Sequence, residues 1–109
     1  MARGRCDTDE LLMNFFDVSI PQEGETFTTL LTWKNVTINR IVSSDHLEER
    51  TYCQEEDEWV VLIEGEAEIW MENRQYLLLK GDMLFIPKQT RHRVVRTTKG
   101  TLWLTVHID

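Results

Sequence analysis

The sequence predicts an all-β protein, a closed barrel or jelly-roll sandwich of short strands. Strand-forming runs follow one another almost without interruption after residue 25, and turn-forming residues separate them at short intervals. Within several runs, large apolar residues recur with the two-residue period of a strand. The expected strands cover residues 27–34, 36–44, 59–63, 66–72, 75–80, 82–87, 92–97 and 101–108.

Turn signals fix the expected connections between these strands. Asn35 separates the first two strands, and Asn73-Arg74 is a two-residue connection of the kind that hairpins use. Gly81 and Lys99-Gly100 mark later turns. These short connections favour strands that pair with their neighbours along the chain.

Only the N-terminal region departs from this pattern. Residues 8–16 are predicted to form a short helix, with Asp7 or Thr8 as its cap. Residues 1–10 contain no periodic apolar positions, so we expect a mobile arm there.

The composition is that of an ordinary globular domain. A chain of 109 residues allows one domain with one core, and apolar and charged contents of 41% and 28% argue against disorder. No apolar run reaches the length of a membrane span, and residues 1–12 lack the apolar core of a secretory signal. Cys6 and Cys53 form no partner motif, which indicates reduced thiols in a cytoplasmic protein. The net charge of −7 argues against nucleic acid as a partner.

Two strands carry large apolar residues on both faces. In residues 59–63 and 101–108 each face holds bulky side chains, whereas a lone barrel covers only one face. On the last strand the two alternating sets are Leu102, Leu104, Val106 and Ile108 against Thr101, Trp103, Thr105 and His107. We therefore expect a second subunit to cover the outer face, which gives a homodimer.

The spacing of a few residues between 46 and 96 is more specific than the strand pattern. Six residues separate Glu58 from Gly65, and fifteen separate Gly65 from Gly81. Gly81 is followed by Pro87 and then His92. This frame resembles the two cupin motifs, here at about residues 46–65 and 81–96. It is most similar to small single-domain bacterial cupins with Y-x-Q in place of H-x-H, over about residues 36–109.

The resemblance implies a cupin-type jelly-roll β-barrel with its site in the mouth. Two of the motif histidines fall on Tyr52 and Gln54 when three residues precede Glu58, or on Thr51 and Cys53 when four do. The first register matches the Y-x-Q subgroup and places both side chains on one strand face. The candidate site is therefore Tyr52, Gln54, Glu58 and His92. Other motif positions also differ, because His46, Gln89 and Arg96 stand at the expected Gly, Gly and Asn.

A cupin site with three histidines and a glutamate would bind Fe, Mn, Ni or Zn. Here one imidazole and one carboxylate remain, from His92 and Glu58. Gln54 offers a weak carbonyl oxygen, and a phenol such as that of Tyr52 must lose a proton with a typical pKa of about 10. We therefore expect weakened metal affinity, with a divalent transition metal as one alternative and a metal-free site as the other.

Neighbouring residues have simpler interpretations. The acidic side chains at 55–57 are expected to be solvated, in contrast to Glu58, whose burial requires a partner such as His92. Cys53 points to the opposite face and is expected to be a packed thiol. His107 shares a strand face with Trp103, and the sequence leaves open whether it reaches the site.

Two classes of function remain. The missing histidines favour a cupin that binds or senses a small polar molecule without catalysis. The alternative is an enzyme of dioxygenase, isomerase or epimerase type acting on a small molecule. In that case His92 and Glu58 would be an acid/base or metal-ligand pair, with Tyr52 as proton donor.

Overall fold

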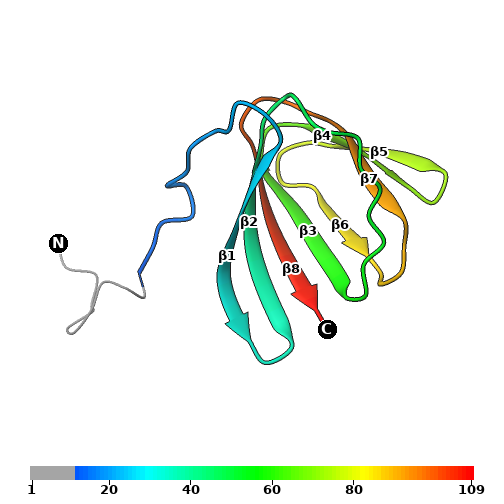
Figure 1. The fold of residues 1–109 in the computed structure, drawn as a ribbon, viewed down its shortest axis with the longest axis horizontal. Coiled ribbons are helices and arrows are strands. Elements are labelled where there is room, and N and C mark those ends of the chain that lie inside the picture. The colour runs from blue at the N-terminus through cyan, green and yellow to red at the C-terminus, as the bar shows by residue number, and fades with distance from the viewer. Residues whose placement is uncertain (1–11) are drawn as a thin grey trace.

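The structure is a computed structural model that describes residues 12–109, and within them the chain folds as eight strands (Figure 1). The bounds of the strands are β1 Glu25–Trp33, β2 Val36–Ser43, β3 Asp57–Glu64, β4 Ala67–Met71, β5 Arg74–Leu78, β6 Met83–Ile86, β7 His92–Thr97 and β8 Thr101–Ile108.

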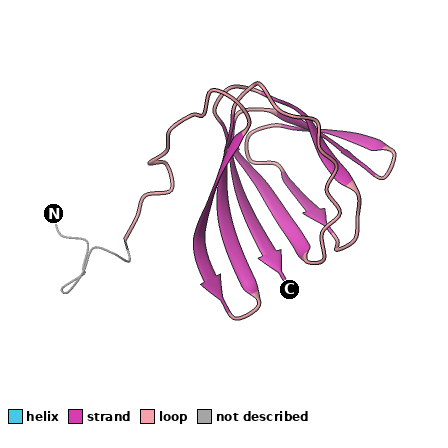
Figure 2. Cartoon of the chain, in the orientation of Figure 1, coloured by secondary structure: helices cyan, strands magenta, loops and turns pink. Residues whose placement is uncertain are grey.

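The strands form two antiparallel sheets that face each other. A five-stranded sheet has the order β1-β2-β8-β3-β6, and a three-stranded sheet has the order β5-β4-β7 (Figure 1). Residues 12–109 contain strands, turns and coil and no helix, so no helix in this range could cross a membrane (Figure 2). The predicted all-β jelly-roll fold is confirmed.

The two hairpins show how local sequence sets the strand pairing. Trp33 pairs with Val36, so the first turn includes the predicted Asn35. In the second hairpin Met71 pairs with Arg74, which makes Glu72 and Asn73 the turn residues. Both have positive φ, 49° and 66°, as primed hairpin turns require. The prediction of an Asn73-Arg74 turn was therefore wrong by one residue, because Arg74 already belongs to the ladder of β5.

Gly65 connects the two sheets at a place where no side chain fits. Its φ is +94°, and a Cβ there would lie 2.6 Å from Oγ1 and 2.9 Å from Cα of Thr101. The end of β3 and the start of β8 therefore approach each other through a bare backbone. This steric requirement explains the glycine of the first motif.

The core lies between the sheets and follows the alternation of the strands. Val60 and Leu62 of β3 point inward, and Trp103 of β8 packs with them at 3% exposure. The buried cluster comprises Val60, Leu62, Ala67, Ile69, Met71, Leu78, Ile86 and Trp103. Burial of these apolar side chains from both sheets provides the main force that holds the two layers together.

A helix was expected over residues 8–16, but the part of this segment that the structure describes, residues 12–16, is not helical. Residues 12–14 are coil and residues 15–16 are a turn, while residues 1–11, including the expected caps and arm, lie outside the described part. Asn14 Oδ1 accepts a hydrogen bond from the backbone nitrogen of Phe16 at 2.8 Å, and such local bonds compete with a helix. The carbonyls of Asn14 and Phe15 accept instead from Arg40 of β2, at 3.4 and 3.1 Å.

The loop between β6 and β7 contains a strained residue. Gln89, which stands at a family glycine position, has a φ of 60°. Its backbone nitrogen donates to the carbonyl of Gln54 at 2.7 Å, which ties this loop to the segment before β3. This hydrogen bond holds Gln89 in the left-handed backbone conformation, which is unfavourable for residues other than glycine.

Replacing Gln89 by glycine is therefore expected to stabilise the fold. Left-handed backbone costs a non-glycine residue about 1–2 kcal/mol, and glycine loses roughly 0.5–1 kcal/mol through chain entropy. We expect Gln89→Gly to raise the free energy of unfolding by up to about 1 kcal/mol in urea denaturation. Lys88→Gly, one residue earlier and without positive φ, serves as control and should lower it. Equal destabilisation by both changes would contradict the explanation.

The outer face of the five-stranded sheet is rich in exposed apolar side chains. Trp33 of β1 is 64% exposed, and Met83 and Phe85 of β6 are 62% and 52% exposed. Met83 and Phe85 pair with Val61 and Trp59, the outward residues of β3. Together with the outward residues of β3 they form an apolar surface, as expected from strands with large apolar residues on both faces.

We therefore predict a homodimer that buries this face, with an interface of roughly 1,600 Å² or more. Light scattering at micromolar concentration should give twice the chain mass of 12.9 kDa. Phe85→Glu should yield a folded single chain, because it places a charge in the apolar contact. Leu77→Glu is the control, since Leu77 is 55% exposed on β5 of the other sheet and should not affect the mass. A single-chain mass for the unmodified protein would refute the dimer.

Candidate functional site

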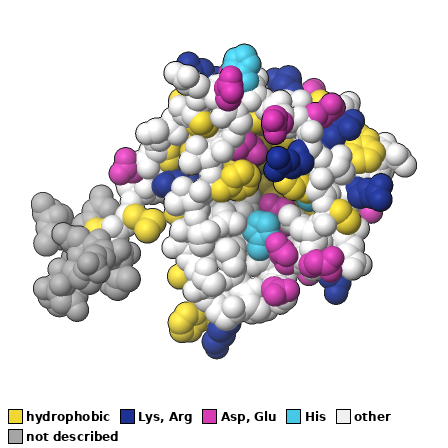
Figure 3. Space-filling model, viewed as in Figure 1, with side chains coloured by type: hydrophobic (Ala, Val, Ile, Leu, Met, Phe, Trp, Pro, Cys, Tyr) yellow, Lys and Arg dark blue, Asp and Glu magenta, His cyan; other side chains and the backbone are white. Residues whose placement is uncertain are grey.

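All four residues of the predicted site line one cavity of about 100 Å³ between the two sheets. Tyr52 and Gln54 come from the segment before β3, Glu58 from β3 and His92 from the start of β7. The face of the molecule drawn in Figure 3 has a hollow with hydrophobic walls, and histidine and acidic side chains lie beside this hollow. The alternative register, Thr51 and Cys53, places both side chains in the solvent.

His92 is held by its neighbours in one orientation. Its Nδ1 lies 3.0 Å from the carbonyl oxygen of Thr90, which can only accept a hydrogen bond. The neutral ring therefore carries its proton on Nδ1 and presents the lone pair of Nε2 toward Glu58 Oε1, 3.8 Å away. Tyr52 stacks on the imidazole with ring centroids 5.8 Å apart, and backbone hydrogen bonds join the two residues in both directions.

Glu58 is 7% exposed, and nitrogen atoms surround its carboxylate. Gln54 Nε2 donates to Oε1 at 2.6 Å, and His107 Nε2 lies 3.5 Å from Oε2. Gln54 therefore supplies the hydrogen-bond donor that a buried carboxylate needs, and the rings of His107 and His92 lie beside the group. His107 of β8 thus reaches the cavity, which settles the point that the sequence left open.

The acidic loop before β3 is only partly solvated, contrary to expectation. Glu56 Oε1 lies 3.2 Å from His107 Nδ1, so this ring stands between two carboxylates. Asp57 opens β3 and accepts a hydrogen bond from the backbone nitrogen of Lys88 at 2.9 Å. The composition of residues 55–57 gave no sign of this, because the partners, Lys88 and His107, follow much later in the chain. Glu55 is exposed, as predicted.

Cys53 is also placed differently from the expectation. It does lie on the opposite side from Tyr52 and Gln54, but it is exposed rather than packed. Tyr52 of this segment pairs with His92, while the side chain of Cys53 is exposed. Cys6 lies outside the described residues.

A second carboxyl group, that of Glu25 of β1, lines the same cavity and was not predicted. Ser43 Oγ donates to Glu25 Oε2, and Trp103 Nε1 donates to Ser43 Oγ at 2.9 Å. Burial raises the pKa of the Glu25 carboxyl above its usual range, and the hydrogen bond from Ser43 offsets part of this rise. No motif marks Glu25, because the sheet pairing of Glu25 with Ser43 brings it to the site.

A larger and more open groove of about 510 Å³ adjoins the cavity. The two hollows share Glu25, Phe27, Tyr52 and Val94 as lining residues. The groove therefore leads from the solvent to the inner cavity, and Glu25 stands at the junction.

The donor set does not fit a resident metal ion. Nε2 of His92 and the Glu58 carboxylate are suitable ligands, but Gln54 turns its amide nitrogen toward Glu58, and Tyr52 contributes a phenol. Among residues 12–109 no group of three or more His, Cys, Asp or Glu side chains is arranged to hold a metal ion. The chemistry of the site is therefore that of a hydrogen-bonded carboxylate and imidazole.

Comparison with known proteins assigns the family. The model of the cupin domain matches residues 45–107, which include both motifs, and the chain belongs to this family. None of the curated proteins compared with the chain matches it.

Solved structures support the same assignment. A protein of Ralstonia eutropha, provisionally described as a mannose-6-phosphate isomerase, is 35% identical over 89% of this chain and 96% of its own, with a TM-score of 0.80. A Streptococcus pyogenes protein of unknown function is 19% identical over 90% and 86%, with a TM-score of 0.77. An RmlC-like cupin of Shewanella frigidimarina is 16% identical over 84% of both chains, with a TM-score of 0.72. The last two similarities concern the fold alone.

The first prediction for the site concerns its missing histidines. Tyr52→His with Gln54→His should raise divalent-metal affinity at least about tenfold, or 1.4 kcal/mol, because both side chains face His92 and Glu58. Thr51→His with Cys53→His is the matched control and should gain nothing. His92→Ala in the first variant should abolish the gain. Calorimetric titration with Ni²⁺ or Zn²⁺ measures these differences, and equal affinity of the two histidine pairs would show that the register is wrong.

The second prediction concerns the stability cost of Glu25. A carboxyl whose folded-state pKa is raised contributes stability at low pH that is lost as the pH rises through that pKa. Glu25→Gln should therefore melt at a higher temperature than the parent protein at pH 7, and the difference should shrink to nothing below the usual value of 4.5. Glu23→Gln, an exposed change two residues away, should show no such dependence. A lower melting temperature for Glu25→Gln at pH 7 would contradict the prediction.

Proposed function

We propose that this cupin binds a small polar molecule in the cavity between its sheets without catalysing a reaction. The observation that supports this most directly is the contact set of Glu58. Gln54 Nε2 donates a hydrogen bond to its carboxylate, and the Nε2 atoms of His92 and His107 lie 3.8 and 3.5 Å from it. A carboxylate held in place in this way is suited to orienting a ligand.

The cavity provides the remaining features of a binding site. It is concave, its walls combine apolar side chains with a few polar groups, and a wide groove leads into it. Its volume of about 100 Å³ admits only a small ligand or one end of a larger ligand. The cytoplasmic location and the homodimer remain part of this proposal.

The alternative is an acid/base enzyme of isomerase or epimerase type. It is favoured by the 35% identity to the Ralstonia eutropha protein provisionally described as a mannose-6-phosphate isomerase. In this reading the Nε2 lone pair of His92 would accept a proton from a substrate carbon, and Glu58 would stabilise the resulting imidazolium. A metal-dependent dioxygenase has less support, because the donor set does not fit a metal.

A screen of small polar molecules by NMR in deuterated water separates these functions. We expect ligands that bind the parent protein but bind Glu58→Gln and His92→Gln at least about tenfold more weakly, or by 1.4 kcal/mol. Asp45→Asn, at an exposed site, is the control and should bind normally. Bound ligands should keep their carbon-bound protons.

Exchange of a ligand proton for deuterium that disappears in Glu58→Gln would establish the enzyme instead. Ligand binding that is unaffected by both site variants would refute the cavity as the binding site. Metal analysis of the purified protein provides an independent check on the metal-dependent alternative.

A further inference from the structure

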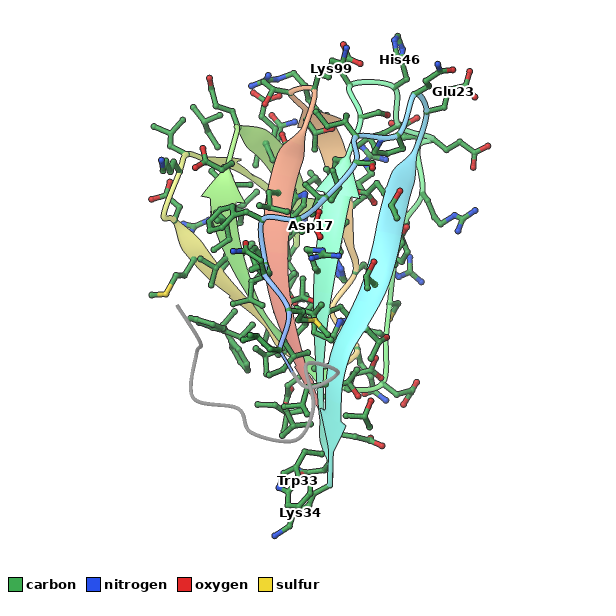
Figure 4. All side chains as sticks on the ribbon, turned by 90° about the vertical axis from the view of Figure 1, so that its left-hand side faces the viewer. Asp17, Glu23, Trp33, Lys34, His46 and Lys99 are labelled. Atoms are coloured by element: carbon green, nitrogen blue, oxygen red, sulfur yellow. The ribbon has the colours of Figure 1, made fainter. Side chains whose placement is uncertain are left out.

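The junction between the groove and the cavity is acidic. The groove is lined by Glu23, Glu25 and Glu48, against Arg50 and His46. The side view shows Glu23 and His46 together at one end of the barrel, with Trp33 and Lys34 at the other (Figure 4).

The basic side chains that line the groove each lie beside a carboxylate. Arg50 lies 3.6 Å from Glu48, and His46 lies 3.5 Å from Asp45. Lys99 lies at the same end of the barrel but lines neither hollow (Figure 4). Among the described residues, neither Glu23 nor Glu25 forms a salt bridge.

A ligand that enters the cavity through the groove passes the carboxyl group of Glu25. Glu25 lines both hollows, together with Phe27 and Tyr52. Its hydrogen bond from Ser43 occupies one oxygen, so the carboxyl group can still accept a further donor. On the inner side, Glu58, His92 and His107 are the other titratable groups of the cavity besides Tyr52, and they contact one another.

A second observation indicates that a polar ligand enters the inner cavity. Thr105 of β8 lines it and is 1% exposed, yet its hydroxyl has no hydrogen-bond partner. A buried hydroxyl without a partner costs roughly 1–3 kcal/mol, so such groups are normally satisfied by a ligand or a water molecule. The remaining walls are largely apolar, with Val60, Ile69 and Trp103 among them.

We propose that the ligand is a small organic cation, such as a primary amine, and that Glu25 selects it by pairing with its ammonium group. This inference rests on the proposed function, because it names the ligand class of the same cavity. A carboxylate or phosphate ligand would meet three glutamates in the groove, and its approach would be opposed by their charge. A cation approaches in a favourable field and satisfies the one cavity carboxyl group that has no nitrogen partner.

Three probes of similar size and different charge test this inference. They are propylammonium, 1-propanol and propionate, used at about pH 7.5, where the amine is protonated and the acid ionised. The reporter is the indole N–H of Trp103, which donates to Ser43 and so is linked through one hydroxyl to Glu25. Its NMR resonance is followed during titration of the parent protein, of Glu25→Gln and of the control Glu23→Gln.

Propylammonium should bind the parent protein and Glu23→Gln at least about tenfold more tightly than 1-propanol, and propionate should bind most weakly. In Glu25→Gln the preference for the amine should fall to within about twofold. Glu25→Gln should remain folded, because glutamine has the same shape and removes only the desolvated charge. A melting curve checks this.

Binding of 1-propanol or propionate as tight as that of the amine would overturn the inference. So would an amine preference that persists in Glu25→Gln. If the three probes fail to shift Trp103 while screened molecules bind in a Glu58-dependent manner, the cation inference fails and the proposed function stands. If those molecules do not bind either, both fail.

Discussion

The barrel depends on the pairing of β8 between β2 and β3. This strand forms the middle of the five-stranded sheet, and its register places Thr105 opposite Asn39 on one side and Val60 on the other. Its inward residues then line the cavity, and His107 meets Glu58. A shift of one residue would turn every inward side chain outward, so the core and the site require the same register.

The two carboxyl groups that line the cavity differ in their surroundings. Glu58 faces three nitrogen-bearing side chains, whereas Glu25 has a single hydroxyl partner. One group is satisfied within the fold, and the other remains costly to ionise. Proteins tolerate such a cost most readily where a group serves a ligand, which is the role that we propose for Glu25.

Alternation and motif spacing were sufficient to predict the strands and the convergence of Tyr52 with His92. These features depend on local periodicity and on a spacing typical of the family. Glu25 and the roles of Glu56 and His107 depend instead on partners that the sheet order brings together, and one sequence contains no local sign of them. The prediction of an N-terminal helix was wrong over residues 12–16. There the side chains of Asn14 and Arg40 form hydrogen bonds with backbone groups that a helix would have paired with each other.

The position of Cys53 offers a practical consequence. Its thiol is exposed, while the residues on either side of it line the cavity. A fluorophore attached to this sulfur would sit outside the binding volume on the same short segment of backbone. Changes in that segment on ligand entry would then alter the emission of the dye, so the protein could be made into an optical sensor without altering any residue that lines the cavity.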